Sequence, residues 1–204
     1  MKYGTISNSP YERSVVTYPF VWWDNAFTDE ELGQIIDYCD AQGLERAQVM
    51  GLEEIEDGRR CDIKFHQRND DTAWIYERMN AVIEGLNNQF YGFDLNGYGA
   101  FQYTTYNAAE RGAYHWHMDI CLGKASLPPS MVQPRKLSLT LLLNDDFEGG
   151  EFMVNLGNEA HAERVLTPKG RVIAFPSFIL HSVRPVTKGI RKSIVIWVTG
   201  AKFR

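Results

Sequence analysis

The stretch 136–144 reads KLSLTLLLN, and the stretch 191–199 reads RKSIVIWVT. Both are rich in aliphatic and β-branched residues and are bounded by Pro, Gly, Asn or Asp, a pattern typical of β-strands. The same pattern recurs along the chain after Gly92, with an apolar period of about two residues. It predicts further strands at 99–106, 113–120, 150–154, 171–175 and 178–183. No helical pattern separates these strands, which excludes a parallel α/β sheet and favours an antiparallel sandwich or jelly roll.

Two helices are predicted before the strands. Thr28 and Glu31 have capping-box spacing, and Gly43 is a plausible stop. One buried stripe follows the cap, made of Leu32, Ile35, Ile36 and Cys39. The second helix is predicted to start near Asp71 or Thr72, with Ile75, Met79, Val82, Ile83, Leu86 and Phe90 on its buried face. We expect a mainly β fold with N-terminal helices, in which the two helices brace one outer face of the jelly roll.

The chain has 204 residues, which fits one domain, 1–204. We divide it into a helical support region, 1–92, and a β-rich core, 93–204, and interpret 51–71 as a loop or short strands. The net charge of −5 makes nucleic acid an unlikely partner. Three cysteines without short spacing indicate neither a disulfide framework nor a zinc site. With no signal peptide pattern and no apolar run long enough for a membrane span, we expect a cytoplasmic protein of open oligomeric state.

Three predicted strands carry polar residues that can do chemistry. His115, His117 and Asp119 alternate along one strand and should share a face. His181 lies in apolar company in a later strand. Two histidines and one carboxylate make up the facial triad of non-haem Fe(II) oxygenases. A hydrogen-bonded His–Asp pair and a satisfied core histidine remain the structural alternatives.

An arginine opens the last predicted strand. Arg191 and Ser193 share a face of that strand, and Lys192 points away. An arginine directed into an apolar barrel needs an anion. Its planar fork suits a carboxylate, and a serine hydroxyl adds a further donor. The alternative is a strand end at the surface with both basic residues solvated.

Together, these residues resemble the Fe(II)/2-oxoglutarate-dependent dioxygenase superfamily, in particular its prolyl 4-hydroxylase-like branch. The resemblance covers 98–204 well and the N-terminal third more loosely. It rests on Tyr106, the His-Met-Asp triplet 117–119, the Gly-Gly-Glu triplet 149–151, His181 and Arg191. Prolyl 4-hydroxylases commonly have lysine at the position of Arg191, whereas arginine is common in related bacterial members.

The resemblance implies a double-stranded β-helix, another name for this jelly roll. It implies that His117, Asp119 and His181 hold Fe(II). It further implies that Arg191 pairs with the distal carboxylate of 2-oxoglutarate, helped by Ser193 and Tyr106. The implied activity uses O2, with ascorbate as a candidate addition. It hydroxylates a peptidyl substrate, prolyl residues included, or an amino-acid-like one, and releases succinate and CO2.

Two other classes of protein remain open. A cupin-like metalloprotein would use His115 and His117 with a downstream glutamate and His181. A jelly-roll module that only binds a ligand would explain the fold without the metal set. Contacts with the partner, a peptide, protein or amino-acid-like substrate, are expected from Trp116, from the loop 122–134 and from Arg59 and Arg60 within 51–71. The loop 122–134 and a second loop, 155–168, are read either as lids or as plain connections.

Overall fold

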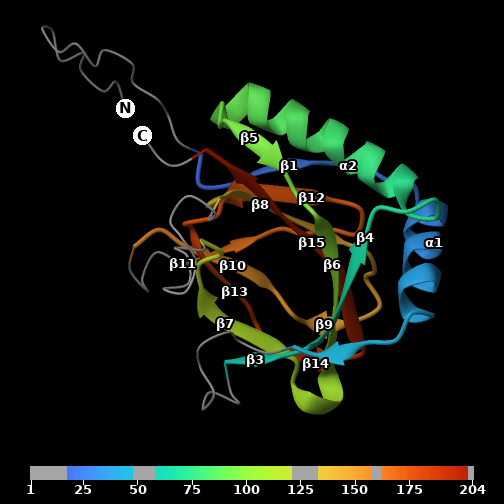
Figure 1. Cartoon of the computed structure of the whole chain (residues 1–204). Coiled ribbons are helices and arrows are strands. Elements are labelled where there is room, and N and C mark those ends of the chain that lie inside the picture. The colour runs from blue at the N-terminus through green and yellow to red at the C-terminus, as the bar shows by residue number, and fades with distance from the viewer. Residues whose placement is uncertain (1–17, 48–57, 121–132, 158–161, 202–204) are drawn as a thin grey trace, which may run out of the picture.

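The computed structural model describes residues 18–47, 58–120, 133–157 and 162–201 (Figure 1). Two α-helices, a short π-helix and a 3-10 turn are present: α1 (Asp29–Asp40), α2 (Ala73–Leu86), η1 (Asn87–Tyr91) and η2 (Ala108–Glu110). The N-terminal strands are β1 (Val21–Trp23), β2 (Glu45–Arg46), β3 (Arg59–Arg60), β4 (Asp62–Gln67) and β5 (Leu95–Gly97). The later strands are β6 (Ala100–Asn107), β7 (Ala113–His117), β8 (Arg135–Leu142), β9 (Glu148–Gly149), β10 (Phe152–Asn155), β11 (Ala162–Val165), β12 (Val172–Pro176), β13 (Leu180–Val183), β14 (Val186–Lys188) and β15 (Ile190–Gly200).

The strands form two main antiparallel sheets. The larger sheet has the order β1-β12-β8-β15-β6-β4-β2, and β5 also pairs with β15. The smaller sheet has the order β11-β10-β13-β7-β3, and β14 pairs with β9 separately. In both sheets, strands that are distant in sequence lie side by side, as β8 and β15 do. This arrangement is typical of a jelly roll. The predicted mainly β, antiparallel fold is confirmed.

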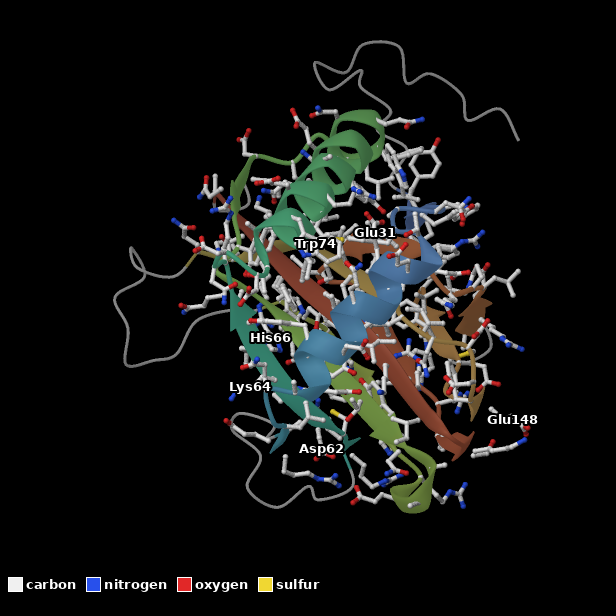
Figure 2. All side chains as sticks on the ribbon, turned by 90° about the vertical axis from the view of Figure 1, so that its right-hand side faces the viewer. Glu31, Asp62, Lys64, His66, Trp74 and Glu148 are labelled. Atoms are coloured by element: carbon white, nitrogen blue, oxygen red, sulfur yellow. The ribbon has the colours of Figure 1, made fainter. Side chains whose placement is uncertain are left out.

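Both helices cover the outer face of the larger sheet (Figure 2). Thr28 Oγ1 accepts from the Glu31 N–H, and a Glu31 carboxylate oxygen accepts from the Thr28 N–H, so the predicted capping box is present. Leu32 and Ile35 of α1, like Ile75 of α2, are buried in one cluster with alternate residues of the sheet. This packing confirms that the helices brace one face.

The period of two divides the larger sheet into a helix face and an inner face. In β15, Ile194 and Ile196 belong to the core under the helices. Arg191, Ser193 and Trp197 therefore point the other way, toward the smaller sheet. A second apolar cluster lies there, formed by Tyr106, Phe152, Val154, Val165, Ile173, Phe175, Val183 and Val186, among others. The inner face thus carries the polar side chains into an otherwise apolar space.

Some predicted boundaries need correction. The strand predicted at 113–120 ends at His117, because the chain turns there and the Asp119 N–H donates to the Ser177 carbonyl at 2.9 Å. The reading of 155–168 as a loop is wrong at 162–165, where β11 pairs with β10.

The N-terminal third also contributes more than helices. β1, β2 and β4 join the larger sheet and β3 joins the smaller one. β3 and β4 are short strands within 51–71, one of the two alternatives predicted there, whereas β1 and β2 were not predicted. Most of the loop 122–134, as well as residues 48–57 and 158–161, lies outside the described residues. Among the described residues, no helix has both the length and the apolar character needed to cross a membrane.

Candidate active site

His117, Asp119 and His181 meet on the inner side of the smaller sheet. His117 is the last residue of β7, and it lies opposite His181 of β13 in the strand ladder. Nε2 of His117 lies 3.7 Å from Oδ1 of Asp119, and Nε2 of His181 lies 3.5 Å from Oδ2. One potential ligand atom from each residue lies within 4.8 Å of the other two. The sheet therefore brings together the three residues that the resemblance implied.

Backbone carbonyls orient both imidazole rings. Nδ1 of His117 lies 2.7 Å from the His115 carbonyl oxygen, and Nδ1 of His181 lies 2.9 Å from the Ile179 carbonyl oxygen. A carbonyl only accepts, so each Nδ1 carries the proton and each Nε2 keeps a free lone pair. Hydrogen bonds of this kind, from Nδ1–H to a backbone carbonyl, hold metal-binding histidines in one tautomer.

The charge state of the group also suits a cation. Burial, together with the neighbouring His181, lowers the pKa of His117 to about 3, so this ring is neutral near pH 7. Burial acts to raise the pKa of Asp119, but neighbouring groups, His181 foremost, outweigh it and hold that pKa below its usual value. Oδ2 of Asp119 is buried and accepts no hydrogen bond. Two imidazole nitrogens and one carboxylate oxygen without a hydrogen bond are a fitting donor set for Fe(II).

His115 does not join this group. The alternation of a regular strand predicts that it shares a face with His117 and Asp119, but β7 is irregular: its pairing with β13 shifts register between Tyr114, opposite Val183, and His117, opposite His181. The side chain of His115 is exposed, and its backbone N–H donates to the Gly58 carbonyl at 2.9 Å. The cupin-like reading needs His115 as a ligand, and the structure does not place it with the other two histidines.

Arg191 lies on the wall formed by β15. Its side chain is among the largest fully buried ones, with 2% of the residue exposed. Nη1 donates to Ser193 Oγ at 3.0 Å, and Cζ lies 5.6 Å from the centre of the Tyr106 ring. Burial lowers the pKa of the guanidinium, and its Nε has no hydrogen-bond partner. No carboxylate of the described residues pairs with it, so this buried cation fits an anionic ligand.

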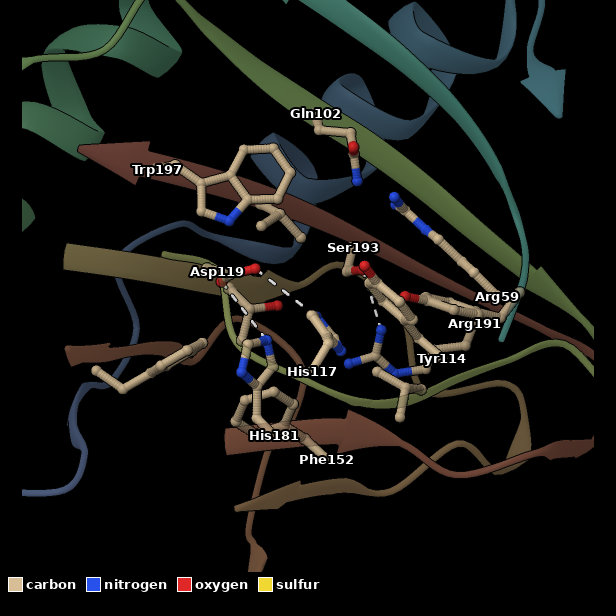
Figure 3. Close-up of a pocket in the computed structure, with 15 residues that line it drawn as sticks. Arg59, Gln102, Tyr114, His117, Asp119, Phe152, His181, Arg191, Ser193 and Trp197 are labelled. Carbon is tan, nitrogen blue, oxygen red and sulfur yellow. Dashed lines mark hydrogen bonds and ion pairs between the residues drawn. The ribbon is translucent and has the colours of Figure 1, made fainter. Parts of the chain in front are cut away.

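The triad and Arg191 border the same pocket (Figure 3). Its lining is Arg59, Gln102, Tyr106, Tyr114, His117, Asp119, Thr140, Phe152, Phe175, His181, Val183, Arg191, Ser193, Val195 and Trp197. Of the expected substrate contacts, Arg59 lines the pocket. Among the described residues, Trp116 and Arg60 are not part of this lining. Sequence reasoning missed Trp197 and Gln102, although the period of two places Trp197 on the same face as Arg191.

The comparisons with known proteins point to 2OG-Fe(II) oxygenases. The model of the 2OG-Fe(II) oxygenase superfamily matches residues 101–199. The PKHD-type hydroxylase YbiX of Shigella boydii serotype 18 is 28% identical over 159 residues, which cover 76% of this chain and 69% of the relative. The same hydroxylase of Escherichia coli O157:H7 is also 28% identical, over 76% of this chain and 68% of the relative.

Solved structures share the fold. A prolyl-4-hydroxylase of Pseudomonas putida superposes with a TM-score of 0.69 at 18% identity, over 92% of this chain and 96% of that one. A prolyl hydroxylase of Trichoplax adhaerens, in complex with a peptide of hypoxia inducible factor, gives 0.71 at 16% identity, over 89% and 84%. At such identities the likeness shows a shared fold. Together with the matched family model and the hydroxylase relatives, it supports a 2OG-Fe(II) oxygenase with a prolyl 4-hydroxylase-like fold.

Proposed function

We propose that this enzyme hydroxylates a peptidyl substrate, prolyl residues included, or an amino-acid-like one, and that it converts 2-oxoglutarate to succinate and CO2. Members of its family use Fe(II), 2-oxoglutarate and O2. One observation carries the proposal: a largely buried group of two histidines and one carboxylate faces the same pocket as a buried arginine that has no carboxylate partner among the described residues. The pocket thus offers one place for a metal cation and one for an anionic cosubstrate.

In this proposal, His117, Asp119 and His181 hold the metal. Each imidazole offers Nε2 because its Nδ1–H is engaged by a backbone carbonyl. Asp119 supplies the one negative charge of the set, through an oxygen that is otherwise without a partner. When bound, the iron and 2-oxoglutarate supply the oxidation by O2 that inserts one oxygen atom into a substrate C–H bond.

Arg191 is proposed to bind the distal carboxylate of 2-oxoglutarate. Its guanidinium is held in place by Ser193 Oγ and by the ring of Tyr106, so little side-chain freedom remains to be lost on binding. Burial removes competing water, which strengthens the contact of a planar guanidinium with a carboxylate. Ser193 and Tyr106 therefore position Arg191 and complete the cosubstrate end of the pocket.

The relatives support the substrate class. The Trichoplax adhaerens enzyme was solved with a peptide, and a Paramecium Bursaria Chlorella virus-1 enzyme of the same fold is a collagen prolyl hydroxylase (TM-score 0.70, 18% identity). Both act at protein side chains, which favours a peptidyl substrate here as well. An amino-acid-like substrate is the alternative that the same pocket admits.

The test is turnover of 2-oxoglutarate by the purified protein. We expect succinate to form only with Fe(II) present, faster with peptides of the right class, and those peptides to gain one oxygen atom by mass spectrometry. The His181→Ala variant should lose both signals. Succinate formation that is absent from the well-folded parent protein, or that persists unchanged in His181→Ala, would contradict the proposal.

A further inference from the structure

A second arginine reaches the pocket beside the metal-binding group. Arg59 of β3 is half-buried, and its Cζ lies 4.6 Å from the centre of the Tyr114 ring. That ring stacks in turn on His117, with the ring centres 3.4 Å apart. Figure 3 shows the Arg59 guanidinium pointing into the pocket on the side of Gln102. Arg59, Tyr114 and His117 therefore form one stack that ends at the metal-binding group.

The contacts of Arg59 leave part of its guanidinium unused. Nε donates to Cys61 Sγ at 3.1 Å, and the face of the guanidinium lies on Tyr114. These two contacts fix the plane of the group while its outer Nη edge remains directed at the pocket. Such an edge matches the two oxygens of a carboxylate. Among the described residues, no carboxylate forms an ion pair with Arg59.

The charges of the pocket lining do not balance. Its described lining contains two arginines, Arg59 and Arg191, and one carboxylate, Asp119. Fe(II) carries two positive charges and 2-oxoglutarate carries two negative ones. Binding of both therefore leaves the excess of one positive charge unchanged. Among the described residues, one positive charge therefore remains in a partly dehydrated site, where an unpaired charge is costly. A single negative charge on the substrate would neutralise it.

We propose that the substrate carries a carboxylate and that Arg59 binds this carboxylate, which makes Arg59 a specificity-determining residue. The inference rests on the proposed function, because it concerns the substrate of the same pocket. Arg191 is the more deeply buried arginine and suits the cosubstrate. Arg59 is only half-buried, so it remains accessible to a substrate that arrives from solvent.

The carboxylate has two sources that share this chemistry. It is either the main-chain carboxylate of a free amino acid or the side chain of an Asp or Glu beside the target residue of a peptide. The probes are therefore two matched sets. One set pairs free L-amino acids with their carboxamides. The other pairs blocked pentapeptides that have proline at the centre and Asp or Glu beside it with the same peptides containing Asn or Gln.

Binding of each probe is measured anaerobically to the protein loaded with Fe(II) and 2-oxoglutarate, by the change in its visible absorbance. We expect one set to bind, with the carboxylate member of a pair about 30-fold tighter than the amide. In Arg59→Gln the ratio of the amide's dissociation constant to that of the carboxylate should fall to near one, while Arg59→Lys should keep part of this preference. Which set binds identifies the source of the carboxylate.

Arg60→Gln is the matched control. It removes the same charge from the same short strand, but Arg60 donates to the Arg111 carbonyl and is not part of the described pocket lining. The discrimination ratio of Arg60→Gln should equal that of the parent.

Three results would overturn the inference: no probe of either set binds, every pair that binds has a ratio near one, or Arg59→Gln keeps the parent ratio. The absorbance band formed with Fe(II) and 2-oxoglutarate before any probe is added separates these results from failure of the proposed function. If that band is absent, the proposed function fails; if it is present without discrimination, only the inference about Arg59 fails.

Discussion

Nε2 of His181 lies 3.5 Å from one oxygen of Asp119, although β13 carries the histidine and Asp119 follows β7. Nε2 of His117 lies 3.7 Å from the other oxygen of the same carboxylate. The two imidazoles thus flank one carboxylate from different strands, and both direct a lone pair toward it. Such a group is stabilised by a cation placed among the three side chains.

The first prediction concerns the carboxylate. Asp119→Ala should lower the affinity for Fe(II) by more than about 100-fold, because even outer-shell partners of a metal are worth 10- to 100-fold. Equilibrium dialysis followed by metal analysis measures this affinity. His115→Ala is the control, since His115 is exposed and lies outside the group. Loss of iron in His115→Ala, with normal binding in Asp119→Ala, would support the cupin-like arrangement instead.

The second prediction compares the contributions of Arg191 and Ser193 to binding of 2-oxoglutarate. Arg191→Gln should raise the dissociation constant of 2-oxoglutarate by about 100-fold or more, because a buried carboxylate loses its charged partner. Ser193→Ala removes one hydrogen bond to Arg191 and should raise it by about 5-fold. Anaerobic titration with 2-oxoglutarate gives both values. A larger effect from Ser193→Ala than from Arg191→Gln would show that the cosubstrate binds elsewhere.

The third prediction explains a glycine of the Gly-Gly-Glu triplet. Gly150 has a φ of +65°, and a Cβ added there would lie 2.9 Å from Cδ of Arg191. Gly150→Ala should therefore displace Arg191 and weaken 2-oxoglutarate binding as well as lowering stability. Gly92→Ala is the matched control, with φ +61° but no atom within 4 Å of the added carbon.

Both alanine variants should lose about 1–2 kcal/mol of stability through left-handed backbone strain. Only Gly150→Ala should lose affinity for 2-oxoglutarate in the anaerobic titration. If Gly150→Ala bound 2-oxoglutarate as the parent does, the contact with Arg191 would have no bearing on the site.

The fourth prediction concerns the dependence of stability on pH. His66 is 5% exposed, its ring stacks on Phe101 with ring centres 5.1 Å apart, and its Nε2 has no hydrogen-bond partner. Burial, with a smaller contribution from the charge of Lys64, lowers the pKa of His66. The unfolded chain therefore binds a proton more readily than the folded one, so stability falls as pH drops below about 6.5.

His66→Phe should remove this part of the pH dependence. The free energy of unfolding of the variant minus that of the parent should be larger at pH 5.5 than at pH 8. Urea unfolding at both pH values measures this difference. Parallel pH dependences of the free energy of unfolding in parent and variant would contradict the prediction.

Much of the fold could be predicted because its signals are local. The capping box of Thr28 and Glu31 and the period-two strands depend on neighbouring residues, and the structure contains both. β4 was harder to predict, since Asp62–Gln67 reads as polar and charged, and it becomes a strand by pairing with β6. Tertiary pairing thus overrides a weak local preference.

The candidate site likewise contains residues that could be predicted from the sequence and residues that could not. The resemblance of the sequence pointed to His117, Asp119, His181 and Arg191, and these residues meet in one pocket. The position of His115 could not be predicted, because the irregularity of β7 appears in its pairing with β13, far along the chain. The stacking of Arg59 on Tyr114 depends on the pairing of β3 with β7, which local sequence does not encode.

The most direct measurement is the anaerobic absorbance of the metal-free protein on adding Fe(II) and then 2-oxoglutarate. The account predicts a visible metal-to-ligand charge-transfer band that is absent in His181→Ala and that needs more 2-oxoglutarate in Arg191→Gln. A well-folded parent protein that gives no band, or an undiminished band in His181→Ala, would contradict the assignment of this pocket to Fe(II) and 2-oxoglutarate.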